Sequence, residues 1–148
     1  MAHTFTNLMY HLIFSTHQRK PLLQSIDLPG LTKIIGGIIH QRDGKLLAFN
    51  AVPDHVHALA ILHPKHAISD MLRDVKSISS DWVHEKGSRE FAWQSGYSAF
   101  TVSKSAAGSV EGYIARQADH HKKQSFEEEL IALLERHGVD YDRRFVFD

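Results

Sequence analysis

The segment from His55 to Leu62 (HVHALAIL) constrains the fold more than any other part of the chain. Successive side chains of a strand point to opposite faces, so one face would carry His55, His57, Leu59 and Ile61. The other face would carry Val56, Ala58, Ala60 and Leu62. Because both faces are largely apolar, we expect a strand that is buried on both sides, with two histidines at its entry end.

The rest of the chain predicts three further strands and four helices. We expect strands at 7–16, 45–52 and 91–102, the last one broken or bulged at Gly96. The short break at Pro53-Asp54 favours a hairpin between 45–52 and 55–62. Apolar residues at helical spacing predict helices over 27–42, 68–87, 106–123 and 125–138. The simplest packing is an α+β, ferredoxin-like antiparallel sheet with helices on one face.

Composition narrows the class of protein. A chain of 148 residues, 43 % of them apolar, predicts a single globular domain over 1–148. It contains no cysteine, which excludes disulfides and thiolate metal sites. No signal peptide or membrane-spanning stretch is evident, so we expect a cytoplasmic protein without a membrane partner. The 17 basic residues equal the 17 acidic ones, so any nucleic-acid surface must be a local basic stripe.

The first candidate site is the pair His55 and His57. Two imidazoles at i and i+2 share one strand face about 6.5–7 Å apart and can converge on a metal ion. The chain has 12 histidines, however, so roughly one H-x-H pair is expected by chance. Hydrogen-bonded core histidines, or surface ones, are therefore the alternative.

The second candidate is the pair Tyr113 and Gln117, which share one face of the predicted helix at i and i+4. A phenol can attack a phosphodiester when it is activated and aimed. Gln117 can offer its amide oxygen to the same metal. The alternative is a packed helix tyrosine with a solvated glutamine.

Several blocks in sequence order resemble the single-tyrosine HUH transposases of the insertion-sequence-two-hundred type (the IS200-like transposase family). In that family a strand carries histidine–hydrophobic–histidine, and a later helix carries a tyrosine with glutamine four residues on. The matching blocks are Tyr10–Thr16 with Arg19 and Pro21, Pro53–His57, Trp93–Phe100, Tyr113 with Gln117–His121, Ser125, Phe126 and Glu129, and His137–Val139 with Tyr141 and Asp142.

The resemblance implies an enzyme in which a C-terminal helix supplies Tyr113 as the nucleophile. It implies one Mg²⁺ or Mn²⁺ held by His55, His57 and Gln117, and imidazole ligands suit Mn²⁺ the better of the two. Cleavage of single-stranded DNA would leave a 5′-phosphotyrosine and a free 3′-OH. Asp54 and His11 would support the metal ligands from behind.

The resemblance also implies partners, namely single-stranded DNA with hairpins and a second copy of the chain. In such homodimers the tyrosine helix of one subunit often serves the metal site of the other. The candidate phosphate contacts are Arg19, Lys20, Arg73, Lys76, Lys104, Arg116, Lys122 and Lys123. Each of them could equally be a solvated surface charge.

Three other functions stay open at this point. The chain could be a module that grips hairpin DNA without cutting it. It could be an unrelated metal-dependent hydrolase that uses the histidines with Asp54. It could also be a small α+β domain with a structural histidine cluster.

Overall fold

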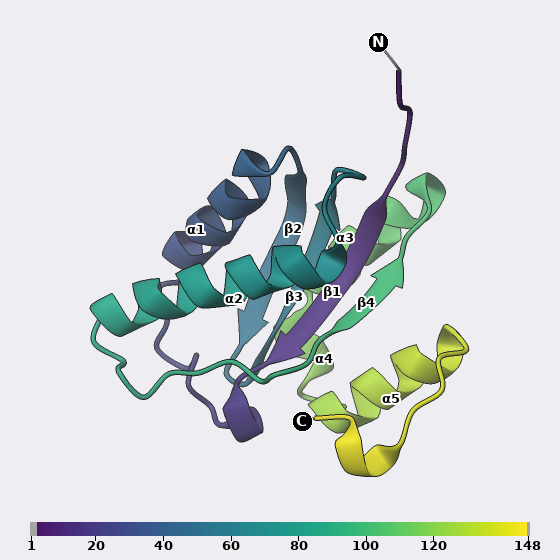
Figure 1. The fold of residues 1–148 in the computed structure, drawn as a ribbon. Helices are drawn as coiled ribbons and strands as arrows, with labels where there is room; N and C mark the ends of the chain where they lie inside the picture. Colours follow the sequence, from purple (N-terminus) through teal and green to yellow (C-terminus); the bar gives the residue numbers. More distant parts are fainter. Residues whose placement is uncertain (1–2, 148) are drawn as a thin grey trace.

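The computed structural model describes residues 3–147 and contains one four-stranded antiparallel sheet. Its strands are β1 (Met9–Ser15), β2 (Lys45–Val52), β3 (His55–Ile61) and β4 (Ser98–Thr101), in the order β2-β3-β1-β4. The strand that is apolar on both faces is indeed internal, between β1 and β2 (Figure 1). The predicted hairpin of β2 and β3 is confirmed.

Two long helices cover one face of the sheet, α1 (Leu28–Gln41) and α2 (Ile68–Glu85). The Asp27 side chain accepts a hydrogen bond from the Gly30 N–H at the start of α1, which satisfies a donor that has no partner within the helix. The core on this face joins even-numbered residues of β1 and β3, such as Leu12 and Val56, to both helices.

The remaining helices lie on the opposite face, so the prediction of helices on one face describes α1 and α2 only. They are α3 (Ala107–Ala115), α4 (Gln117–His120) and α5 (Phe126–Arg136). Met9 and Leu59 pack against Ile114 of α3, and Ile13 packs against α5. Both faces are covered because β3 is apolar on both faces. This second layer encloses the face that carries His55 and His57 (Figure 1).

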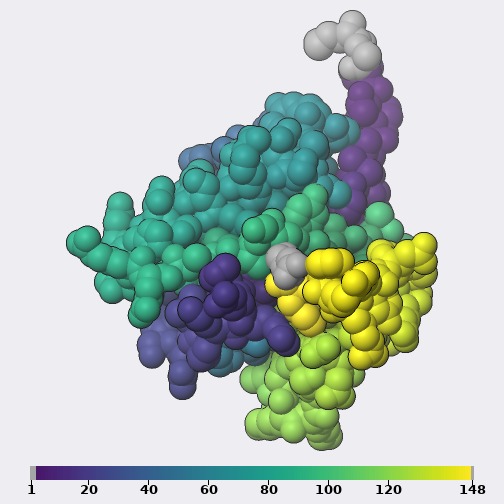
Figure 2. Space-filling model, turned by 60° about the horizontal axis from the view of Figure 1, so that its bottom comes forward, coloured from purple at the N-terminus to yellow at the C-terminus, as the bar shows by residue number. Residues whose placement is uncertain are grey.

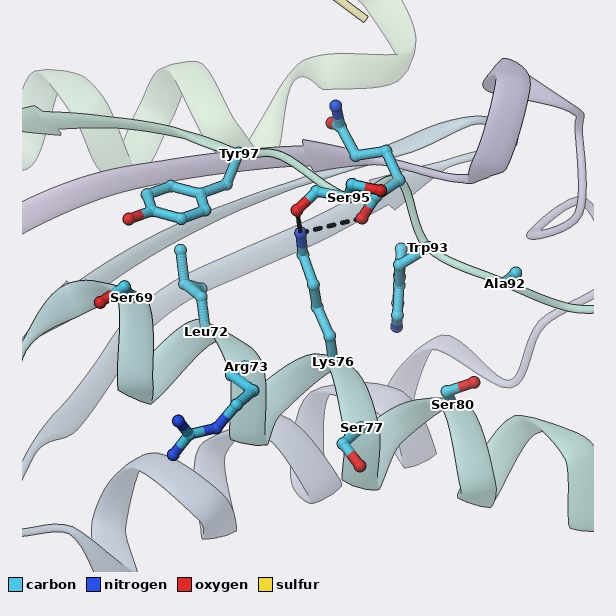
Figure 3. Close-up of a pocket in the computed structure, with 11 residues that line it drawn as sticks. Ser69, Leu72, Arg73, Lys76, Ser77, Ser80, Ala92, Trp93, Ser95 and Tyr97 are labelled. Atoms are coloured by element: carbon cyan, nitrogen blue, oxygen red, sulfur yellow. Dashed lines mark hydrogen bonds between the residues drawn. The ribbon is translucent and has the colours of Figure 1, made fainter. Parts of the chain in front are cut away.

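The fourth strand is much shorter than the predicted 91–102. Only Ser98–Thr101 pairs as a strand, and Trp93 makes a single bridge to Thr16. The Lys76 ammonium of α2 donates to the carbonyls of Gln94, Ser95 and Gly96, at 3.0, 3.4 and 2.5 Å. Figure 3 shows Lys76 reaching from α2 to Ser95. These carbonyls are bonded to a side chain and take no part in a strand ladder.

The predicted helix over 106–123 is broken in two at Arg116, which has φ −101° and ψ 22°. The break leaves the last carbonyls of α3 without helical partners. Asn50 of β2 satisfies one of them, because its side-chain amide donates to the Ile114 carbonyl at 2.9 Å. Tyr113 therefore lies in the last turn of α3, and Gln117 begins α4.

Three short 3-10 helices complete the fold: η1 (His17–Arg19), η2 (Lys104–Ala106) and η3 (Arg143–Phe145). The yellow segment that ends at Phe147 lies beside the purple segment that contains η1 (Figure 2). The Arg19 guanidinium lies 4.3 Å from the centre of the Phe147 ring. Among the described residues, no helix is both long and apolar enough to cross a bilayer.

Candidate metal centre and tyrosine site

His55 and His57 point from β3 into the layer beneath α3–α5, and their side chains are 0 % and 1 % exposed. One ring nitrogen of each is bonded on its outer side. His55 Nδ1 lies 2.7 Å from Asp54 Oδ1, and His57 Nδ1 lies 2.7 Å from His11 Nε2. The Nε2 atoms of both rings therefore face a common centre. Asp54 and His11 therefore hold the two imidazoles in a fixed orientation, the kind of support that imidazole ligands receive in metal sites.

Glu129 of α5 lies at that centre and is 2 % exposed. Its Oε1 lies 3.1 Å from His57 Nε2, 3.1 Å from His121 Nε2 and 3.4 Å from His55 Nε2. The ligand atoms of these four side chains all lie within 4.8 Å of one another, so the group could hold a divalent metal ion. A proton or a cation between nitrogen and oxygen is needed to make these contacts attractive.

Gln117 is fully buried and joins the same cluster, because its Oε1 lies 3.0 Å from His121 Nε2. Within the described part of the chain, His55 Nε2 has no hydrogen-bond partner. Buried polar atoms without partners are rare and costly. Imidazole, carboxylate and amide groups are suitable donors for a divalent cation, so the residues present fit a metal ion.

Tyr113 reaches this cluster within its own chain. Its hydroxyl donates a hydrogen bond to Glu129 Oε2, and its ring lies edge-on to His57, with 5.9 Å between ring centroids. His120 stacks on the Tyr113 ring, with 4.6 Å between ring centroids. Burial and the Glu129 carboxylate raise the pKa of Tyr113 well above its usual value, whereas Gln117 and Arg136 act in the opposite direction.

The electrostatics keep two of the imidazoles neutral. Burial lowers the pKa of His57 to about 4, and burial together with His57 lowers the pKa of His11 to about 3. For Glu129, burial acts to raise the pKa, but its contacts with the imidazoles of His55 and His57 outweigh burial and hold the pKa well below its usual range. For His55, burial acts to lower the pKa, but its contacts with the carboxylates of Asp54 and Glu129 outweigh burial and raise the pKa. At neutral pH the site therefore combines neutral His57 and His11 with an ionised carboxylate, and a metal ion would require His55 to be neutral as well.

The predicted phosphate contacts do not form one continuous stripe. Arg73 and Lys76 lie on α2, on the face opposite Tyr113, and Lys76 is engaged by the carbonyls described above. Two others are paired with carboxylates, Arg19 with Glu127 and Lys122 with Asp119. The side chains of the other four predicted contacts are exposed. Lys104, Arg116 and Lys123 lie in or beside α3 and α4, and Lys20 follows η1.

A hollow of about 640 Å³ opens beside Tyr113, between β4, α3 and α5. Buried apolar side chains, including Phe100 and Leu133, line it together with Val110. Arg116 and Arg136 also line it and are exposed. The hollow thus combines an apolar surface with cationic groups next to the phenol.

Sequence reasoning identified His55, His57, Gln117 and Tyr113, and the structure brings them together. It did not assign a role to His121 or Glu129. Both stand in the blocks that carry the family resemblance, but no spacing rule connects a residue of α5 to a pair on β3.

Comparison with known proteins shows that this chain is a DNA transposase by class. Residues 4–117 match the family described as "Transposase IS200 like", and the chain belongs to this family. A transposase for insertion sequence element IS200 from Salmonella typhimurium is 27 % identical over 130 residues, which cover 82 % of this chain and 84 % of the relative. The ISDra2 transposase TnpA from Deinococcus radiodurans is 29 % identical over 119 residues, covering 76 % and 85 %.

Solved structures agree with this assignment. A crystal structure of a protein described as a transposase from Deinococcus radiodurans R1 superposes with a TM-score of 0.61 at 28 % identity, covering 79 % of this chain and 95 % of that one. A tyrosine transposase bound to a REP hairpin gives a TM-score of 0.60 at 15 % identity, covering 100 % and 90 %. The second match shows a shared fold alone.

Proposed function

We propose that this transposase cuts and rejoins single-stranded DNA with Tyr113 as the nucleophile. His55, His57 and Gln117 would hold one Mg²⁺ or Mn²⁺ ion. The observation that carries the proposal is that the Tyr113 phenol and the imidazole cluster meet on the two oxygens of one buried carboxylate. A site of this kind can place a nucleophile and a cation around one phosphate.

The chemistry follows from these groups. When bound, a divalent cation supplies charge that polarises the scissile phosphate. The Tyr113 oxygen forms a bond to phosphorus as the bond from phosphorus to the 3′-oxygen breaks. The phenol loses its proton and the leaving oxygen gains one, which gives a 5′-phosphotyrosine and a free 3′-OH. A 3′-OH of another strand can reverse the step, so no external energy source is needed.

The surroundings of the site favour transfer over hydrolysis. His55, His57 and Gln117 are buried, and the half-buried Tyr113 is hydrogen-bonded to the carboxylate. The phenol is therefore the nucleophile closest to the cluster. Support from Asp54 and His11 keeps the imidazole nitrogens aimed at the centre.

The DNA strand would enter through the hollow beside Tyr113. Its apolar surface suits the faces of bases, and Arg116 and Arg136 suit phosphates. Arg19, Lys20, Lys104, Lys122 and Lys123 remain candidate contacts to flanking DNA, as Arg73 does on the other face. Recognition of hairpins is supported by the hairpin-bound structure that shares this fold.

A homodimer is part of the proposal because the family resemblance implies it. The Tyr113 hydroxyl contacts Glu129 of the same chain, so all the groups of the proposed site can come from one chain. A cytoplasmic location stays a prediction from the sequence.

The test is formation of a covalent adduct between the protein and a labelled single-stranded hairpin in Mn²⁺. Wild type and the control Tyr97→Phe, which removes an exposed hydroxyl, should give an adduct that survives denaturation. Tyr113→Phe should give none. Hairpin binding without an adduct would instead indicate a binding module, and strand hydrolysis that persists in Tyr113→Phe would indicate a hydrolase. Failure to bind Mn²⁺ would leave a structural histidine cluster.

A further inference from the structure

We propose that Glu129 couples the nucleophile to the metal centre, with one carboxylate oxygen as a metal ligand and the other as the acceptor that positions Tyr113. This role deepens the proposed function and rests on it. It adds a residue to the expected ligand set of His55, His57 and Gln117.

The geometry assigns the two oxygens different tasks. All the imidazole contacts of Glu129 are made by Oε1, which faces His55, His57 and His121 at 3.1–3.4 Å. The hydrogen bond from the Tyr113 hydroxyl is made by Oε2. A carboxylate can bind a cation through one oxygen and accept a hydrogen bond through the other. Glu129 therefore fixes the distance between the phenol and the cation position.

The cost of burying Glu129 argues for a specific role. A buried carboxylate is strongly destabilising unless it is paired and hydrogen-bonded. The first turn of α5 contains two other glutamates, Glu127 and Glu128, and neither is buried. Glu129 is the acidic residue of that turn that faces the cluster, and its partners are all residues of the candidate site.

Packing of α5 sets the position of this carboxylate. Ser125 caps the helix, accepting a hydrogen bond from the Glu128 N–H at 3.1 Å. Phe126 stacks on the His55 ring, with 3.8 Å between centroids and 10° between planes. Leu130 and Leu133 anchor the next turns in the core with Ile13. The helix register is thus determined by contacts that do not involve Glu129, which leaves its carboxylate free to serve two partners.

The first arm of the test measures Mn²⁺ binding without DNA, from the electron paramagnetic resonance signal of free Mn²⁺. Glu129→Gln keeps the size of the side chain but loses its charge, and should weaken Mn²⁺ binding at least about tenfold. Glu128→Gln removes the same charge one residue earlier and should leave binding within about twofold. Glu129→Asp keeps the charge with a shorter reach and should restore part of the affinity.

The second arm measures how firmly the phenol is held, in metal-free buffer. The rate at which N-acetylimidazole acetylates Tyr113 is followed by peptide mass spectrometry, with Tyr97 as an internal reference. Glu129→Ala should make Tyr113 react faster relative to Tyr97, because the hydroxyl loses its acceptor. Glu128→Ala should leave the ratio unchanged. Circular dichroism confirms that each variant is folded.

The outcomes separate this inference from the proposed function. If Glu129→Gln binds Mn²⁺ as wild type does, or if Glu129→Ala leaves Tyr113 reactivity unchanged, the coupling role is overturned even if wild type forms a DNA adduct. If both arms give the expected changes but wild type forms no adduct, the coupling geometry stands and the transfer chemistry fails. Tyr113→Phe removes a hydrogen bond to the ligating carboxylate but no ligand atom, so its loss of Mn²⁺ affinity should be smaller than that of Glu129→Gln.

Discussion

Replacing Lys76 with methionine separates a structural role of this residue from a role in DNA binding. Its ammonium lies over the segment before β4 and donates to the carbonyls of Gln94 at 3.0 Å and Gly96 at 2.5 Å. A longer contact joins it to the Ser95 carbonyl (Figure 3). Burial lowers the pKa of Lys76 to about 8, so the amine is still mostly protonated at pH 7. Methionine keeps most of the apolar stem but cannot donate.

The expected loss of stability follows from these contacts. A hydrogen bond to a charged group contributes about 1.5–3 kcal/mol, so the two shorter bonds contribute roughly 3–6 kcal/mol before any offset. Dehydration of the half-buried ammonium offsets part of this amount. We expect Lys76→Met to lower the free energy of unfolding by about 2–3 kcal/mol. For a chain of this size that corresponds to a Tm lower by about 4–12 °C.

Urea denaturation at pH 7, followed by circular dichroism, measures this change. Arg73→Met is the matched control, since Arg73 lies one turn earlier on α2 and pairs with Asp70 and Asp74 at the surface. Its effect should stay below about 1 kcal/mol. A Lys76→Met variant as stable as wild type would refute the structural role of Lys76. If the slope of log affinity for DNA against log salt concentration also became smaller by about one, Lys76 would instead be a phosphate contact.

Three further predictions concern the site itself. In metal-free buffer, the free energy of unfolding should fall as pH falls from about 6.5 towards 4, because burial lowers the pKa of His11 and His57 in the folded state and only the unfolded chain takes up the protons. Urea titrations at several pH values should show that the slope of this free energy against pH is smaller in His11→Leu, by up to about 1.4 kcal/mol per pH unit. Asn50→Ala should lower unfolding free energy by about 1 kcal/mol and slow adduct formation, since the end of the tyrosine helix loses its donor; an unchanged adduct rate would argue against this anchoring. Ser109→Trp should fill the hollow beside Tyr113 and weaken the binding of labelled oligo(dT), measured by fluorescence anisotropy. An affinity equal to that of wild type would mean that the DNA strand does not bind in this hollow.

The local sequence pattern was enough to predict most of the sheet and the pairing of His55 with His57 and of Tyr113 with Gln117. Alternation in β1 and β3 requires extended backbone, and a strand with both faces apolar requires a central position. The same alternation places His55 and His57 on one face whatever the surroundings are. The spacing of Tyr113 and Gln117 likewise predicts one shared helix face. The helix is broken at Arg116, but both side chains still reach the same cluster.

Only the tertiary structure decided which groups complete the site. Glu129 and His121 meet β3 because α5 packs back onto the sheet, a contact between segments far apart in the chain. Position 129 follows two other glutamates, so no local pattern distinguishes the one that is buried. The shortening of β4 and the break after α3 share one feature. In both, a side chain from another element, Lys76 or Asn50, satisfies backbone carbonyls that have no partner in a regular strand or helix, and no local pattern predicts such a contact.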